Sequence, residues 1–385
     1  MMLRSQSKNI DTALVDARHK RKQNEQLDAI KNPSEPAAKK QHSKGLTELR
    51  AHISGFKIDS AKRNPYGESI PEESVENQPP KKSSGGMITK LSAEDPCPHY
   101  DYDLEEANNP ESVSEYAPDI FKYYKKRENY FRVFDYLKSH PEIDVKTRAI
   151  LVDWMVEIQE TFELNHETLY NAVKITDMYL SKTKNIDKAA IQKLACVAVF
   201  IAAKYDERSP PLVDDLIYLS GDRFSRDELL AMERELFSAI DFDLGSPLSY
   251  RYLRRLGRVC RIDMKALTLA RYILETTLLV YDYALVSQSR LAGASFLLAM
   301  RMTDKNYEWS PVLEKYSGYS SGDIVPLMEH INHAMHHVTN KWSQLMSIRQ
   351  KYSHEVFFSV AKIPFLPDVY GNSNTLAPLP RIEYP

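Results

Sequence analysis

Glycine is missing from a long central stretch of the chain. The sequence has 385 residues and 12 glycines, and none of these glycines falls between residues 87 and 220. Glycine-rich loops that bind phosphate, and tight hairpin turns, depend on backbone angles that glycine adopts most readily. This stretch is therefore neither a dinucleotide-binding fold nor a hairpin-rich sheet, and we expect an all-α fold.

The ends of the chain differ in composition from its middle. Residues 1–95 carry six prolines, 17 basic and 13 acidic residues, but only two aromatic residues. Such a segment buries too little apolar surface to offset the entropy that is lost on folding, so we predict a disordered regulatory tail. Residues 363–385 hold five prolines and are expected to form an extended C-terminal tail.

Between the tails, apolar residues recur with helical spacing. Residues 116–139 are predicted to form a leading amphipathic helix, with Tyr123 and Phe134 among the residues on its apolar face. Asn165 is predicted to be the N-cap of a later helix. Residues 190–204 are apolar on nearly all sides, which predicts a central buried helix.

Short sequence similarities repeat at an offset of about 96–101 residues. The repeats are Leu194-Ala195 with Leu291-Ala292, Ser209-Pro210 with Ser310-Pro311, and Ala231-Met232-Glu233 with Leu327-Met328-Glu329. A single offset of this size indicates two copies of one module rather than a solenoid. We therefore predict two tandem five-helix modules, at residues 140–243 and 244–362, after the leading helix.

The sequence contains none of the common motifs of enzyme active sites, such as a Walker loop, GxGxxG, GxSxG or a kinase catalytic run. His166-Glu167 begins a near match to the zinc-protease pattern HExxH, but Tyr170 replaces the second histidine ligand. Four more histidines gather on one predicted helix, where we expect an exposed polar face rather than a metal site: His330, His333, His336 and His337. No metal and no cofactor is predicted.

Charge and cysteine content narrow the classes of partner. The formal net charge of −2 provides no general attraction to nucleic acid or to an acidic membrane. No apolar run reaches the roughly 20 residues of a membrane span. Cys97, Cys196 and Cys260 are too far apart for a CxxC zinc site or a disulfide framework, which fits a reducing intracellular compartment. We expect a protein that binds neither nucleic acid nor membrane.

Several ordered segments resemble the cyclin box, and together they span roughly residues 115–367. The segments are RAILVDW at 148–154, AAKYDERSPP at 202–211, LAMEREL at 230–236 and PLSYRYLRR at 247–255. The run VDWMVEIQETFELNHETLYNAV at 152–173 is most similar to the third subclass of B-type mitotic cyclins. The resemblance implies two tandem cyclin-box modules.

The resemblance also implies a function. Mitotic cyclins are regulatory subunits that bind and activate a cyclin-dependent serine/threonine kinase and help direct its substrates during cell division, while ATP and Mg²⁺ stay with the kinase. The chain itself is then not an enzyme. Lys204 and Glu233 match the two charged residues with which cyclins hold the kinase, although either could instead be an ordinary solvated charge. Arg148 and Asp177 match an internal ion pair between two helices, which is a structural role.

A second set of residues matches the patch that binds Arg-x-Leu substrate peptides in cyclins: Ile150, Leu151, Trp154, Glu157, Ile191 and Gln192. The position before Arg148, usually methionine in this patch, is Thr147, so docking is expected to be weaker. The alternative is that Ile150 and Trp154 are mainly core residues.

The N-terminal tail contains two short runs that resemble regulatory signals. Arg50-Ala51-His52-Ile53 is a degenerate form of the RxxL destruction signal that recruits the ubiquitin-ligase machinery to mitotic cyclins. Basic residues at Arg18, Lys20, Arg21 and Lys22 resemble a nuclear import signal. The first run could also occur by chance, and the second could be an ordinary run of solvated charges. A nuclear location is expected, with further pools in the cytoplasm and on mitotic structures.

Two other classes of function have less support in the sequence. A transcription-initiation factor of the IIB type has tandem cyclin-like folds and binds promoter DNA, but it also has an N-terminal zinc ribbon. Cys97 is the only cysteine before the two modules, so this chain lacks such a ribbon. A helical hydrolase would need turnover by the isolated chain, which no motif predicts.

Overall fold

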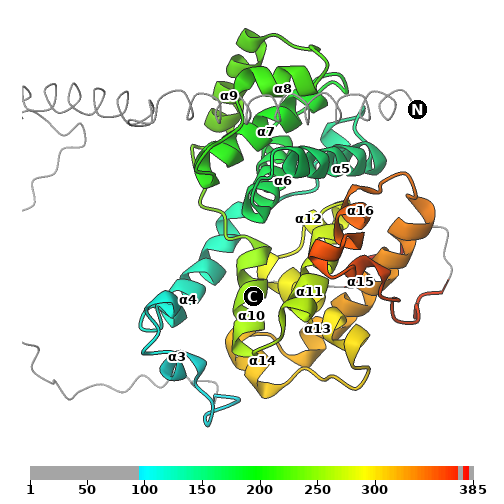
Figure 1. Cartoon of the computed structure of the whole chain (residues 1–385). Helices are drawn as coiled ribbons and strands as arrows, with labels where there is room; N and C mark the ends of the chain where they lie inside the picture. Colours follow the sequence, from blue (N-terminus) through cyan, green and yellow to red (C-terminus); the bar gives the residue numbers. More distant parts are fainter. Residues whose placement is uncertain (1–94, 372–375, 381–385) are drawn as a thin grey trace, which may run out of the picture. The chain divides into compact units, whose positions relative to one another are not determined.

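The computed structural model describes residues 95–371 and 376–380 of the chain. All regular structure in these ranges is helical, and it falls into two modules (Figure 1). The all-α prediction is therefore confirmed for the described residues. No helix in these ranges has both the length and the apolar character that crossing a membrane requires.

The first module is built around one buried helix. Its helices are α5 (Val145–Thr161), α6 (His166–Lys182), α7 (Ile191–Asp206), α8 (Val213–Leu219) and α9 (Arg226–Ala239). Helix α7 packs against α5, α6 and α9, and every side chain from Leu194 to Ala203 is buried. The alanines of α7 let the neighbouring helices approach closely, as its sequence predicted.

Local side chains define where these helices begin. The Oδ1 atom of Asp144 accepts a hydrogen bond of 2.7 Å from the Thr147 N–H and caps α5. Ser225 and Glu228 form a capping box at α9. Asn165 is the N-cap residue of α6, as predicted, but its side chain makes no capping hydrogen bond to the helix. The turn after α7 brings the Glu207 carboxylate to this position, where it accepts a hydrogen bond of 2.6 Å from the Asn165 N–H.

The second module repeats this arrangement. Its helices are α10 (Ser249–Val259), α11 (Met264–Thr277), the short α12 (Tyr281–Ala284), α13 (Gln288–Thr303), α14 (Pro311–Ser317) and α15 (Ser321–Lys341). Helix α13 is the buried counterpart of α7 and packs against α10, α11 and α15. Leu291-Ala292 lies in α13 as Leu194-Ala195 lies in α7, so the sequence repeat corresponds to equivalent helices.

The segment before the first module is not the single helix that was predicted for residues 116–139. It consists of α3 (Tyr102–Glu105), η1 (Pro110–Ser112), α4 (Ala117–Arg127), η2 (Glu128–Phe131) and η3 (Leu137–Ser139). The α-helix ends at Arg127, since Glu128 turns inward toward α13. There its carboxylate accepts hydrogen bonds from the Ser289 N–H at 3.0 Å and the Ser289 hydroxyl at 2.6 Å.

A C-terminal helix joins the two modules. Helix α16 (Ser347–Ser353) is followed by η4 (Glu355–Phe357) and η5 (Val360–Lys362). The buried ammonium of Lys351 donates to Glu275 of α11 at 2.6 Å and to Gln159 of α5 at 2.7 Å. Because α5 and α11 belong to different modules, α16 acts as a clasp between them.

Candidate functional site

A charged pair is presented at the surface where the buried helix α7 ends. Lys204 lies in the last turn of α7 and forms an ion pair with Glu233 of α9. The Lys204 side chain is 43% exposed, and the Glu233 side chain is 16% exposed. The ammonium of Lys204 also lies 4.3 Å from the centroid of the Phe200 ring. The structure thus brings together two predicted site residues that lie 29 positions apart.

An aromatic surface continues from this pair along α9. Phe237 follows Glu233 by one helical turn, so both lie on the same side of α9. The exposed ring of Phe242, in the linker after α9, packs edge-on against Phe237 with centroids 5.0 Å apart. Asp241 and Phe242 both have positive φ angles, so the linker turns sharply at the point where it presents this ring.

Phe134 extends this surface from the leading segment. Its carbonyl oxygen accepts a hydrogen bond of 3.4 Å from Ser181 near the end of α6, and the neighbouring Lys182 pairs with Asp241 beside Phe242. The ring of Phe134 is 67% exposed, so its predicted place on a buried helical face is wrong. Tyr123 is exposed as well, although it lies within α4. For Phe134, the helical period that predicted burial ends with α4 at Arg127. We call Lys204, Glu233, Phe237, Phe242 and Phe134 the charged–aromatic surface.

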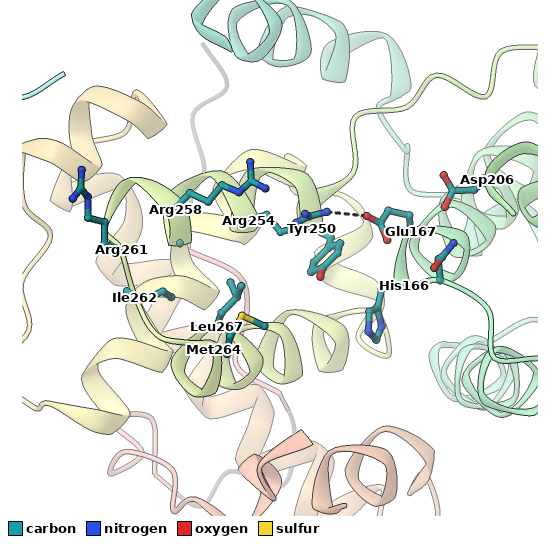
Figure 2. A pocket seen from close by; sticks show the side chains of 12 residues that line it. His166, Glu167, Asp206, Tyr250, Arg254, Arg258, Arg261, Ile262, Met264 and Leu267 are labelled. Atoms are coloured by element: carbon teal, nitrogen blue, oxygen red, sulfur yellow. Dashed lines mark ion pairs between the residues drawn. The ribbon is translucent and has the colours of Figure 1, made fainter. Parts of the chain in front are cut away.

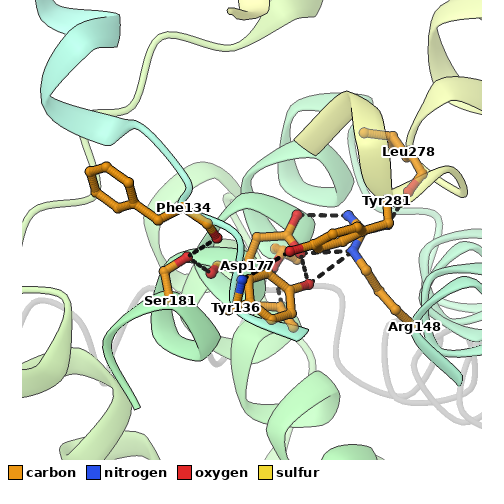
Figure 3. Close-up of polar contacts among 9 residues, drawn as sticks. Phe134, Tyr136, Arg148, Asp177, Ser181, Leu278 and Tyr281 are labelled. Atoms are coloured by element: carbon orange, nitrogen blue, oxygen red, sulfur yellow. Dashed lines mark hydrogen bonds and ion pairs between the residues drawn. The ribbon is translucent and has the colours of Figure 1, made fainter. Parts of the chain in front are cut away.

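A buried polar joint connects Arg148, Asp177 and Tyr136 (Figure 3). Arg148 of α5 donates to both carboxylate oxygens of Asp177 of α6, at 2.8 and 2.7 Å. The hydroxyl of Tyr136, in the leading segment, donates to the same carboxylate at 2.7 Å. Arg148 also donates to the Leu278 carbonyl, and the Tyr281 hydroxyl accepts the Tyr136 N–H. The joint therefore links the leading segment, the first module and the second module.

The charges of this joint stabilise one another. Arg148 is 2% exposed, and burial alone would lower the pKa of its guanidinium. The adjacent Asp177 and Tyr136 outweigh burial and raise that pKa, so Arg148 stays charged. Burial and the Asp177 carboxylate raise the pKa of Tyr136 well above its usual value, so its hydroxyl keeps the donated proton.

Comparison with known proteins shows which family has this architecture. The family description "Cyclin, N-terminal domain" matches residues 119–245, and "Cyclin, C-terminal domain" matches residues 247–366. The chain is 72% identical to the G2/mitotic-specific cyclin-B3 of Caenorhabditis elegans, over the full length of both proteins.

The chain belongs to the cyclin family, in the B3 class of mitotic cyclins.

Two other relatives agree with this placement. The cyclin is 42% identical to the cyclin-B3 of Gallus gallus over 298 residues, which cover 77% of this chain and 68% of the chicken protein. The crystal structure of a viral cyclin from herpesvirus saimiri matches 60% of this chain and 99% of its own chain, with 25% identity and a TM-score of 0.50. The family consists of regulatory subunits.

The predicted peptide-docking patch of this cyclin is only partly at the surface. Leu151 and Ile191 are each 5% exposed and belong to the core, because α5 and α7 pack against each other there. Little of either side chain is therefore accessible to a peptide. Four residues of the patch remain accessible: Ile150, Trp154, Glu157 and Gln192. Glu157 accepts a hydrogen bond of 3.2 Å from the Ser347 hydroxyl, and Gln192 accepts one of 2.6 Å from Arg223.

An open cleft of about 750 Å³ lies between the two cyclin boxes (Figure 2). Arg254, Arg258 and Arg261 line one wall, from α10 and the turn after it. Glu167 and Asp206 line the opposite wall, and Arg254 pairs with Glu167 at 3.6 Å. Sequence reasoning did not identify this cleft, because its two walls come from different boxes. Its arginine-lined wall has the chemistry to bind anionic groups.

The remaining candidate residues fall into two groups. The destruction-signal residues Arg50 and Ile53, and the import residues Arg18, Lys20, Arg21 and Lys22, lie outside the described residues. The predicted exposed histidine face on α15 is wrong, since His330 and His333 are 0% and 2% exposed. No group of three or more metal-ligating side chains occurs among the residues that the structure describes.

Proposed function

We propose that the charged–aromatic surface binds the regulatory helix of a mitotic cyclin-dependent kinase. The chain is a mitotic cyclin that regulates a cyclin-dependent kinase. To do so, it needs a surface whose charges orient the kinase and whose apolar side chains bind it. The observation that carries the proposal is the Lys204–Glu233 pair at the surface, with Phe237 one turn further along α9 and the exposed Phe242 packed against Phe237.

The two charges suit the polar groups of a helix. The Lys204 ammonium is a donor that can bond the free carbonyls at the C-terminal end of a partner helix, where the helix dipole favours a cation. The Glu233 carboxylate is an acceptor for free backbone N–H groups. In the free chain each side chain holds the other in place, so both are oriented before the partner arrives.

The aromatic rings supply the affinity. Phe242 is 64% exposed and Phe134 is 67% exposed. Large aromatic side chains that become buried at the centre of an interface commonly dominate its binding energy. Their exposure in the free chain is typical of a surface that is completed by a partner.

Activation then follows from differential binding. The cyclin binds the kinase with its regulatory helix held inward, which places the helix glutamate against the kinase lysine that aligns the ATP phosphates. Shifting a two-state equilibrium from 1:99 to 99:1 requires about 5.5 kcal/mol of differential binding energy. The chain performs no catalysis; ATP and Mg²⁺ are bound by the kinase.

The test exchanges the two charges. The double variant Lys204→Glu with Glu233→Lys keeps an internal ion pair but presents the opposite charge at each position. We expect its melting temperature to stay close to wild type, while affinity for the mitotic kinase falls about 100-fold, roughly 2.7 kcal/mol, and kinase activation is lost. Binding is measured by titration calorimetry and activation by phosphorylation of a histone substrate.

Arg226→Ala on α9 serves as the matched control, since it also removes an exposed ion pair, with Asp214, on the same helix. It should bind and activate like wild type. Normal kinase binding by the charge-exchanged variant would reject the proposed surface.

We further propose that Ile150, Trp154, Glu157 and Gln192 help dock substrate peptides, that the Arg50–Ile53 run recruits a ubiquitin ligase, and that the Arg18–Lys22 run directs nuclear import. Family resemblance and residue type support these assignments. Fluorescent fusions followed through mitosis test the last two: replacing the import run with alanine should move the protein to the cytoplasm, and Arg50→Ala should delay its loss. An unchanged distribution and lifetime would reject both.

The alternative of a IIB-type transcription factor has no support. Both modules match cyclin descriptions, and the matches together cover most of the described residues.

A further inference from the structure

A positive charge from outside α5 and α7 lies beside the proposed docking face, which consists of Ile150, Trp154, Glu157 and Gln192. The charge belongs to Arg223, in the turn between α8 and α9. Its Nη1 atom donates a hydrogen bond of 2.6 Å to Gln192 Oε1, in the first turn of α7. The two residues are 31 positions apart, so only the fold brings this charge to the docking face.

The turn that carries Arg223 is fixed on both sides. Before it, Asp222 has a positive φ angle, and its N–H donates to the Ile217 carbonyl at 3.1 Å. After it, the buried Phe224 anchors the turn in the core, and Ser225 begins the capping box of α9. The backbone therefore holds Arg223 next to α7 before any peptide binds, which lowers the entropy that binding costs.

The charge of Arg223 is not balanced inside the chain. Its partner Gln192 is a neutral amide, and no carboxylate pairs with Arg223 among the residues that the structure describes. The next residue of α7 differs, since Lys193 pairs with Glu228 at 3.9 Å. A guanidinium has five N–H donors in a planar fork, and the bond to Gln192 uses one of them. Arg223 is exposed, so its other donors can bind a carboxylate of a partner.

The acidic residue of the docking face is already engaged. The Glu157 carboxylate accepts a hydrogen bond of 3.2 Å from the Ser347 hydroxyl, at the start of α16. The Ser347 N–H donates to Asp153 at 3.1 Å, which fixes the serine beside α5. A peptide arginine bound at Glu157 would share the carboxylate with this serine. It would also add a second positive charge to a face that already carries Arg223, which is unfavourable.

Resting on the proposed role of this face in docking, we propose that Arg223 sets its specificity and selects peptides that carry an aspartate or glutamate beside an apolar residue. Ile150 and Trp154 contact the apolar residue, and the remaining N–H groups of Arg223 bind the carboxylate. An arginine at the same position of the peptide faces the guanidinium as a like charge and binds less well. The face thereby prefers acidic peptides to basic ones.

Paired peptides test this preference with the full chain. Two fluorescein-labelled peptides differ at one position, with the core Glu-Ala-Leu-Phe in one and Arg-Ala-Leu-Phe in the other, and fluorescence polarisation measures the affinity of each. We expect the glutamate peptide to bind wild type about fivefold more tightly, a size typical of exposed charge pairs. The preference should shrink in about 0.5 M NaCl, because salt screens exposed charges.

Substitutions at Arg223 identify the source of the preference. Arg223→Glu should reverse it and Arg223→Gln should abolish it, whereas Arg223→Lys should keep most of it, because the charge is retained. Arg226→Glu is the matched control, since it makes the same change of net charge at an exposed arginine whose partner is Asp214. It should keep the wild-type preference. All four variants should melt close to wild type, because both arginines are exposed.

Trp154→Ala separates this specificity from docking itself. Suppose that both peptides need Trp154, but wild type does not prefer the glutamate peptide or Arg223→Glu leaves the preference unchanged. The role of Arg223 is then rejected, while docking on this face stands. If neither peptide responds to Trp154→Ala, docking on this face is rejected, and the role of Arg223 is rejected with it.

Discussion

At the scale of single residues, the joint around Arg148 depends on partners that lie far away along the chain. Arg148 and Asp177 are paired inside the first module, but Leu278 and Tyr281 of the second module complete the joint. A buried ion pair of this kind is weak evidence for net stability, yet removing one partner leaves an uncompensated charge. A single substitution in this joint is therefore expected to lower the free energy of unfolding strongly.

We predict that Asp177→Asn lowers the free energy of unfolding by about 3–5 kcal/mol, since it leaves the buried guanidinium of Arg148 without its counter-charge. Urea denaturation followed by circular dichroism measures this loss. The exposed pair of Lys182 with Asp241 provides the comparison: Lys182→Ala should cost less than about 1 kcal/mol. Equal losses in the two variants would contradict the proposed role of burial.

At the scale of one element, α5 has one face in the core and another face that remains accessible. Leu151 faces the core, while Thr147, Ile150 and Trp154 recur at helical spacing on the side that remains accessible. The same helix thereby supports the fold with one face and offers a shallow apolar contact with the other.

Thr147→Met tests whether this face docks peptides. Methionine would add roughly 40 Å² of apolar contact, worth about 1 kcal/mol, so affinity for an Arg-x-Leu peptide should rise about fivefold. Fluorescence polarisation with a labelled peptide measures the change. Val145→Met, at an exposed position in the first turn of α5, is the control and should leave affinity unchanged. If Thr147→Met and Trp154→Ala both bind like wild type, peptides do not dock on this face.

At the scale of the whole molecule, the clasp formed by α16 couples the two boxes. Lys351 is 4% exposed and Glu275 is 0% exposed, and each depends on the other for charge balance. Burial would raise the pKa of Glu275, but Lys351 and His166 outweigh it and hold that pKa at about 2. A lowered carboxyl pKa stabilises the fold above about pH 4.3, the usual unfolded value, and the gain disappears as the pH falls toward 2.

We predict that Lys351→Met separates the unfolding of the two boxes, because it removes the bridge to Gln159 and leaves the Glu275 carboxylate buried and unpaired. Calorimetry should show one cooperative transition in wild type and two in the variant, with a loss of about 3–5 kcal/mol. Lys362→Met, at an exposed lysine, should keep a single transition. In wild type, stability should decline between about pH 4.5 and pH 2; a single transition in Lys351→Met would contradict the coupling.

Much of the candidate site could be predicted from local signals. The apolar run of α7 and the repeated Leu-Ala and Ser-Pro pairs are enough to place a buried helix in each of two modules, since helical burial follows from residue spacing. Lys204 and Glu233 could be selected because their surrounding segments resemble a known family. None of these predictions needed the position of a distant residue.

Contacts between segments far apart in the sequence were determined only by the tertiary structure. Glu128 after α4 is bound by Ser289, the Asn165 N–H before α6 is bound by Glu207, and the buried His333 lies against Asp368. From the sequence alone, the glycine-free stretch excluded glycine-rich loops and tight hairpins, and the spacing of apolar residues then predicted helices in this region. It did not determine which aromatic rings face water, because exposure depends on the packing of whole elements and not on local spacing.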